Sequence, residues 1–139
     1  MLFRSGLMRE GAVLLNFSRE GVVANDAVRL NGLTGFAVTK LDVLSGLRKL
    51  KIATGYQVDG ASFAYMPENI RKARMAKPVY EEVDGWEAEL PGIRSYEELP
   101  EQAQSYLKRI EDLTGVAPMI VSVGPDREET LLLRNPFAG

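Results

Sequence analysis

The chain of 139 residues contains no cysteine and no histidine. The absence of cysteine excludes disulfides, thiolate chemistry and cysteine-ligated metal sites, and it fits a reducing compartment. The absence of histidine excludes a Ser-His-Asp triad, a histidine general base and a histidine–zinc site within this chain. Two of the commonest sources of catalytic chemistry are therefore missing.

The chain also lacks a large excess of charge of either sign and any long hydrophobic run. Lysine and arginine number 17 and aspartate and glutamate 19, for a net charge of −2. The chain therefore has no net positive charge to attract nucleic acid or an anionic membrane. No apolar run approaches the ~20 residues of a membrane span, and the broken apolar pattern of residues 1–11 is unlike a signal peptide. We expect a cytoplasmic protein that binds neither nucleic acid nor membrane.

The remaining composition is that of an ordinary globular domain, with 45% hydrophobic and 26% charged residues. The length suits one domain with its own core, so we assign residues 1–139 to a single domain. Residues 1–23 follow no clear period and are either a poorly specified or a foreign start. Residues 24–139 carry the organised pattern.

Apolar periodicity along the chain predicts alternating strands and helices. Strands are expected at residues 12–17 (weakly), 35–38, 50–58, 61–65, 78–83 and 118–123. Helices are expected at residues 24–33, 67–75 and 100–113, with a helical turn at 42–46. Residues 130–133 fit a strand or a short helix. Asp59-Gly60 predicts a two-residue hairpin turn. The fold class is therefore α/β, with a mixed, mostly parallel sheet, flanking helices and a β-hairpin.

Several local patterns lead to finer predictions. Alternation in residues 50–58 places Leu50, Ile52, Thr54 and Tyr56 on one face of a strand. Proline in the first turn is expected to start the helix at 67–75, whose cations should face solvent. The spacing of Ser95 and Glu98 is compatible with a capping box. The helix at 100–113 carries an apolar stripe, and the single tryptophan is read as a loop residue packed on the core. The residues of the stripe are Leu99, Ala103, Tyr106, Leu107, Ile110 and Leu113.

The residues that end two of the strands suggest a binding site. The run GFAVTKLD at residues 35–42 is apolar first and polar at its end, where open α/β sheets bind ligands. The Asp42 carboxylate can accept two hydrogen bonds from a guanine edge, and the Lys40 stem can cover the ring. A solvated strand-end turn is the simpler reading of the same residues.

A second polar turn follows the strand at 118–123. If the two strands are neighbours, their ends face one pocket, where Ser122 and Gly124 add a hydroxyl and backbone donors. Gly124 would also let the backbone approach a flat base closely. A guanine needs an acceptor pair for N1–H and the 2-amino group, and a donor for O6. These residues supply that combination.

Longer motifs resemble the adenylosuccinate synthetase family. They are NGLTGFAVTKLDVLSGL from residue 31, KPVYEE from 77, Gly85-Trp86 and SYEELP from 95. YLKRIEDLTGV from 106, SVGPDREET from 122 and LRNPF from 133 complete the set. The resemblance covers about residues 27–139, like the C-terminal third of the family, and implies part of a P-loop-NTPase-like adenylosuccinate synthetase fold.

The family joins IMP and L-aspartate to form adenylosuccinate, with GTP hydrolysis and magnesium, in AMP biosynthesis. The resemblance implies a cytoplasmic homodimer with these three substrates. It assigns Lys40, Leu41 and Asp42 to the first guanine contact, and Ser122, Val123 and Gly124 to the second.

The family's phosphate loop, GDEGKGK, and its catalytic aspartate and histidine have no counterpart in this chain. We therefore assign no catalytic residue and no metal ligand, and we expect magnesium to be bound by the part of the enzyme that is missing here. The isolated chain is expected to be inactive. The alternatives are a non-catalytic guanine-nucleotide-binding or interaction module, and an inactive truncated fragment.

Overall fold

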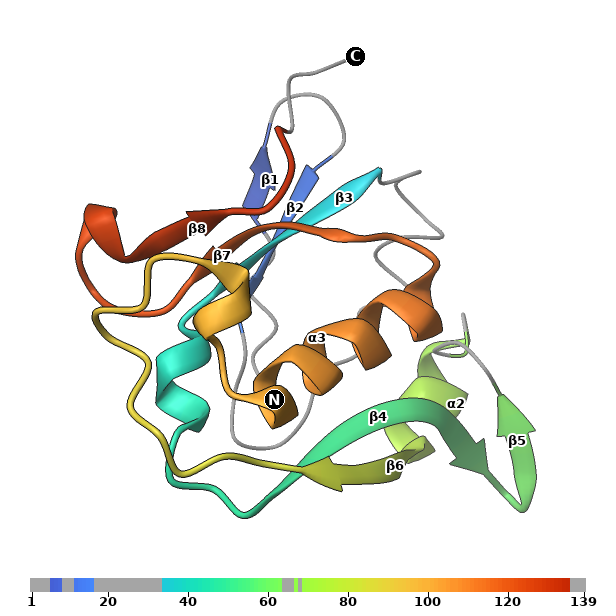
Figure 1. The fold of residues 1–139 in the computed structure, drawn as a ribbon. Helices are drawn as coiled ribbons and strands as arrows, with labels where there is room; N and C mark the ends of the chain where they lie inside the picture. Colours follow the sequence, from blue (N-terminus) through green and yellow to red (C-terminus); the bar gives the residue numbers. More distant parts are fainter. Residues whose placement is uncertain (1–5, 9–11, 17–33, 64–66, 68, 136–139) are drawn as a thin grey trace.

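The computed structural model describes residues 6–8, 12–16, 34–63, 67 and 69–135. Two β-sheets enclose one long helix, α3 (Figure 1). The strands are β1 (Gly6–Met8), β2 (Ala12–Asn16), β3 (Gly35–Thr39), β4 (Lys49–Val58), β5 (Ala61–Phe63), β6 (Lys77–Asp84), β7 (Pro118–Ser122) and β8 (Thr130–Leu132). The helices are α2 (Ile70–Met75) and α3 (Glu101–Thr114), with short 3-10 turns η1 (Leu41–Leu44), η2 (Tyr96–Glu98) and η3 (Arg127–Glu129).

The first sheet has five strands in the order β1-β2-β3-β7-β8. Its middle strands run parallel, β2 with β3 and β3 with β7, while β1 and β8 are antiparallel to their neighbours. The predicted α/β class with a mixed sheet is confirmed. Of the two readings of residues 130–133, the strand is correct, because this segment pairs with β7 as β8.

The predicted hairpin belongs to a second sheet, which the sequence pattern had not separated from the first. This antiparallel sheet has the order β5-β4-β6. Asp59 and Gly60 connect β4 to β5 with φ angles of 49° and 80°. Both angles lie in the left-handed region that a two-residue hairpin of this type requires, so the predicted turn is confirmed.

Helix α3 lies between the two sheets (Figure 1). The predicted stripe is buried except for Leu113, which is partly buried at the edge of the core. Gly115 ends the helix with φ 71°, as glycine commonly does. The core also takes Val38 and Val121 from the first sheet and Leu50 and Ile52 from the second. Trp86 lies 3% exposed in this core, so its predicted role is confirmed.

The predicted alternation of β4 is wrong in its middle. The register with β6 shifts between Ala53 and Gly55, and Ala53 is buried while Thr54 is only partly buried. A bulge adds a residue to one strand and disrupts the alternation of side chains locally. Tyr56 and Val58 return to the buried face.

Two predicted helix starts are also corrected. Helix α2 begins at Ile70 rather than at Pro67, because Asn69 Oδ1 accepts hydrogen bonds from the N–H groups of residues 71 and 72. Its cations face solvent as predicted. Ser95 and Glu98 do not form a capping box. The Glu98 carboxylate accepts from the Arg94 N–H at 3.1 Å instead, one residue before the expected position.

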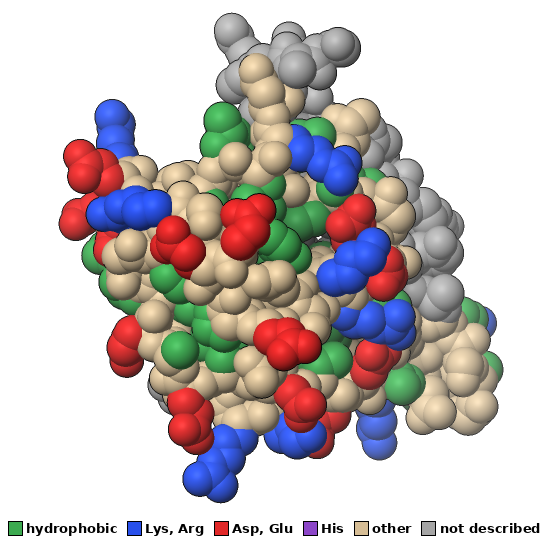
Figure 2. All heavy atoms as spheres, in the orientation of Figure 1, with side chains coloured by type: hydrophobic (Ala, Val, Ile, Leu, Met, Phe, Trp, Pro, Cys, Tyr) green, Lys and Arg blue, Asp and Glu red, His purple; other side chains and the backbone are tan. Residues whose placement is uncertain are grey.

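The helix predicted at 24–33 lies outside the described residues, as do the expected ends of two strands at residues 17 and 64–65. Among the helices that the structure describes, none is long and apolar enough to cross a membrane. Figure 2 shows charged side chains of both signs interspersed over the viewed face, as the nearly balanced composition suggests.

Candidate functional site

The two predicted contact segments leave the same edge of the five-stranded sheet. Strands β3 and β7 pair in parallel, with Val38 opposite Val121, so their carboxyl ends lie next to each other. The condition set from the sequence, that the two strands be neighbours, is therefore met. The turn η1 that follows β3 also contacts β7.

Lys40 makes the chain turn sharply as it leaves β3. Its φ and ψ are 58° and 40°, a left-handed conformation that is uncommon for residues other than glycine. Its carbonyl accepts a hydrogen bond from the Val43 N–H at 3.2 Å, which starts η1. The side chain is exposed. Leu41, which follows, is fully buried in the core and can reach a ligand only through its backbone.

Asp42 lies inside η1 rather than at its start. The N-cap position belongs to Lys40, so a capping role for the Asp42 side chain is not supported by this geometry. The residue is partly buried. Among the residues that the structure describes, the Asp42 carboxylate has no hydrogen-bond or ion-pair partner. Its oxygens are available to an external donor.

The second segment forms a turn in which most polar groups are already used. Ser122 Oγ donates to the Gly124 carbonyl at 3.0 Å, so the hydroxyl oxygen keeps its lone pairs for another donor. The Val123 N–H donates to the Glu129 carbonyl at 2.8 Å, and the Val123 side chain is fully buried. Within the described part of the chain, the Gly124 N–H has no partner.

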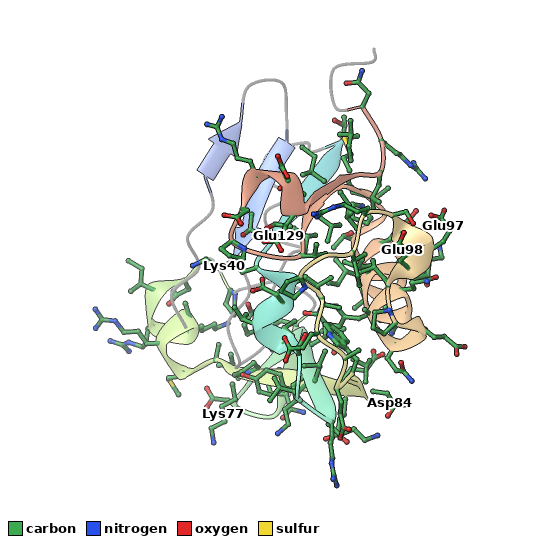
Figure 3. All side chains as sticks on the ribbon, turned by 60° about the vertical axis from the view of Figure 1, so that its left-hand side comes forward. Lys40, Lys77, Asp84, Glu97, Glu98 and Glu129 are labelled. Carbon is green, nitrogen blue, oxygen red and sulfur yellow. The ribbon has the colours of Figure 1, made fainter. Side chains whose placement is uncertain are left out.

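Glu129 is a neighbour of this site that sequence reasoning missed. It ends η3, after the turn, and Figure 3 labels it together with Lys40. Its Oε2 accepts from the Asp126 N–H at 3.1 Å. A Cβ at Gly124 would collide with the same carboxylate. A capping-box pattern, Asp126 followed three residues later by Glu129, was the signal available in the sequence.

Trp86 binds the C-terminal end of η1 through two hydrogen bonds. Its indole Nε1–H donates to Ser45 Oγ at 3.1 Å, and its carbonyl accepts from the Gly46 N–H at 2.9 Å. The indole also lies against Tyr106 of α3, with ring centroids 5.9 Å apart. The sequence predicted that Trp86 packs on the core, but it did not reveal that this residue binds the C-terminal end of η1.

A separate hollow of about 480 Å³ lies between η2, α3 and β8. Its lining mixes Arg94, Lys108 and Arg134 with Glu97 and Glu111, and it contains none of the predicted contact residues. Across the described ranges, no three or more Asp or Glu side chains lie together where they could hold a metal ion. The described residues thus offer no cluster of ligands for the magnesium that the resemblance implies.

Comparison with known proteins decides the family. The sequence profile of adenylosuccinate synthetase matches residues 19–131. The chain belongs to the adenylosuccinate synthetase family. Over 118 residues, the adenylosuccinate synthetases of Desulfotalea psychrophila, Geotalea uraniireducens and Myxococcus xanthus are 59%, 49% and 48% identical to it. Each match covers 85% of this chain and 27% of the relative, so the chain spans about a quarter of their length.

A solved structure agrees with this assignment. The chain is similar to the fully ligated adenylosuccinate synthetase from Plasmodium falciparum, with a TM-score of 0.69 and 28% sequence identity. The match covers 75% of this chain and 26% of that one. The fold described above is therefore a portion of an adenylosuccinate synthetase fold.

Proposed function

We propose that this chain is the guanine-recognising part of an adenylosuccinate synthetase. In the whole enzyme it would serve the GTP-dependent joining of IMP and L-aspartate. The observation that carries the proposal is the parallel pairing of β3 with β7. This pairing sets Lys40 and Asp42 beside the turn of Ser122 and Gly124.

The free hydrogen-bonding groups match a guanine edge. The two Asp42 oxygens suit the N1–H and the 2-amino group, because a carboxylate accepts several hydrogen bonds. The Gly124 N–H is the donor left for O6, since the neighbouring Val123 and Asp126 N–H groups are bound within the turn. The exposed Lys40 stem is suited to cover the ring face.

The test is the base preference of the Asp42→Asn variant of this chain. The change turns one acceptor into a donor that faces a guanine donor, and each lost charge-assisted hydrogen bond costs about 1.5–3 kcal/mol. We expect GTP to bind roughly 10- to 100-fold more weakly. XTP should gain, because its 2-carbonyl can accept from the new amide. Titration calorimetry with GTP, ITP and XTP measures the three affinities.

Asp59→Asn is the matched control. It makes the same chemical change in the β4–β5 hairpin turn, where asparagine is equally suited to a positive φ. It should leave all three affinities unchanged. Lys40→Ala should weaken the three nucleotides evenly, because they share the ring face that its stem would cover. A GTP-to-XTP ratio that Asp42→Asn leaves unaltered would refute the guanine-reading role.

A further inference from the structure

We propose that Glu129 is a positioning residue for the purine 6-oxo contact. Its carboxylate, seated in the space beside Gly124, holds the turn after β7 so that the Gly124 N–H faces the ligand. This inference rests on the guanine-reading function proposed above, and it adds a residue outside the two contact segments.

Glu129 ties the turn on both sides of Gly124. Before the glycine, the Val123 N–H donates to the Glu129 carbonyl at 2.8 Å. After it, the Asp126 N–H donates to Glu129 Oε2 at 3.1 Å, and the Glu129 N–H donates to the Asp126 carbonyl at 3.0 Å. One residue therefore fixes the backbone on both sides of the amide that would meet O6, at Val123 and at Asp126. Pro125, between them, offers no N–H of its own.

Gly124 is explained by the same carboxylate. Its φ is not among the positive angles of the described glycines, which occur at Gly46, Gly60, Gly92 and Gly115. Backbone conformation therefore does not demand a glycine here. The space that a Cβ would fill is taken by the Glu129 carboxylate. The sequence suggested that a glycine at position 124 lets the backbone come close to a flat base. In the structure, the absence of a side chain also makes room for the Glu129 carboxylate.

This arrangement makes a specific prediction for Gly124→Ala. Because the colliding atoms are the mobile end of a side chain, the new methyl group should displace the Glu129 carboxylate and break its bond to the Asp126 N–H. The variant should then behave like Glu129→Ala. Combining both changes should cost no more than either alone, since they remove one and the same interaction.

The binding experiment compares Glu129→Ala, Glu129→Gln, Gly124→Ala and the Gly124→Ala/Glu129→Ala double variant. Affinities for GTP, ITP and ATP are measured by calorimetry. Guanine and hypoxanthine share the 6-oxo group, whereas adenine carries a 6-amino group that cannot accept from an N–H. Glu129→Ala should therefore weaken GTP and ITP by the same factor, about 5- to 10-fold for one misplaced neutral hydrogen bond. ATP should be unaffected.

Glu129→Gln should bind GTP as tightly as the wild type does, because the amide oxygen can still accept from the Asp126 N–H. Glu128→Ala is the control, since Glu128 is exposed and belongs to the same turn η3. It should leave all affinities unchanged. Equal GTP affinity in wild type and Glu129→Ala would overturn the inference. So would an equal loss for GTP and ATP, which would indicate a general loss of structure.

Amide hydrogen exchange without nucleotide separates this inference from the proposed function. The Asp126 N–H should exchange faster in Glu129→Ala and in Gly124→Ala, and at the wild-type rate in Glu129→Gln and Glu128→Ala. Unchanged exchange in Glu129→Ala would overturn the positioning role even if GTP binds. A wild-type chain that binds no guanine nucleotide would instead refute the proposed function, and exchange would then decide the role of Glu129.

Discussion

Leu41 and Val123 occupy equivalent places in the two contact segments. Each is fully buried and lies next to a residue with a free hydrogen-bonding group, Asp42 in one case and Gly124 in the other. An apolar anchor with strong packing reduces the motion of its neighbours, because a core side chain has many contacts and few alternative positions. The site thus depends on core packing within one residue of its polar groups.

At this scale we predict the effect of Leu41→Ala. Truncating a fully buried leucine leaves a cavity and should cost about 2–5 kcal/mol of unfolding free energy, measured by urea denaturation. Val43→Ala is the matched control in the same turn. Val43 is 43% exposed, so its truncation should change stability by less than about 0.5 kcal/mol. Equal effects of the two changes would contradict the anchoring role of Leu41.

Among the elements, α3 is linked to the second sheet by one well-formed ion pair. Arg109 Nε and Nη2 donate to the two Glu81 oxygens of β6 at 2.7 and 2.6 Å. This hydrogen-bonded guanidinium lowers the pKa of Glu81 below its usual value. A lowered pKa stabilises the fold above the unfolded pKa of about 4.3 and loses that effect as pH falls through the folded value.

Glu81→Gln should therefore cost stability at pH 7, and the cost should shrink as the pH falls through the folded pKa of Glu81. The Arg109 and Glu81 side chains are 40% and 33% exposed, so solvent screening should limit the cost to on the order of 1 kcal/mol or less. Urea unfolding between pH 3 and 7 measures it. Glu82→Gln, at the exposed neighbouring position, should show a smaller change. A loss that does not depend on pH would rule out the ionic origin.

The elements also show how far the sequence determines the fold. The stripe of α3 and the Asp59-Gly60 turn were predictable because each depends on local geometry. The bulge in β4 was not, since register depends on the partner strand β6. The sequence could not predict that β3 pairs with β7, so the shared pocket was predicted only on the condition that the two strands are neighbours. Likewise, the spacing of Asp126 and Glu129 could indicate a capping box, but it could not place Glu129 at the site, because the contact with Gly124 exists only once the turn has closed.

For the whole molecule we predict that the isolated chain does not form adenylosuccinate from IMP, GTP and L-aspartate. Phosphoryl transfer needs hydrogen-bond donors positioned around the phosphates, a metal ion and a base. The 139 residues contain no histidine and no phosphate loop of the family type. Chromatographic assay of the purified chain should give no more product than a protein-free control. Product above that background would contradict this expectation.

The pairing of β7 with β3, the central strand of the five-stranded sheet, has a consequence for the order of folding. Roughly eighty residues separate the end of β3 from the end of β7, and closing so long a loop is entropically costly. The hairpin of β4 and β5 and the helix α3 depend on near neighbours and can form early. We therefore expect the ligand-facing edge of β3 and β7 to form late, so that during synthesis this site would be among the last features to acquire its shape.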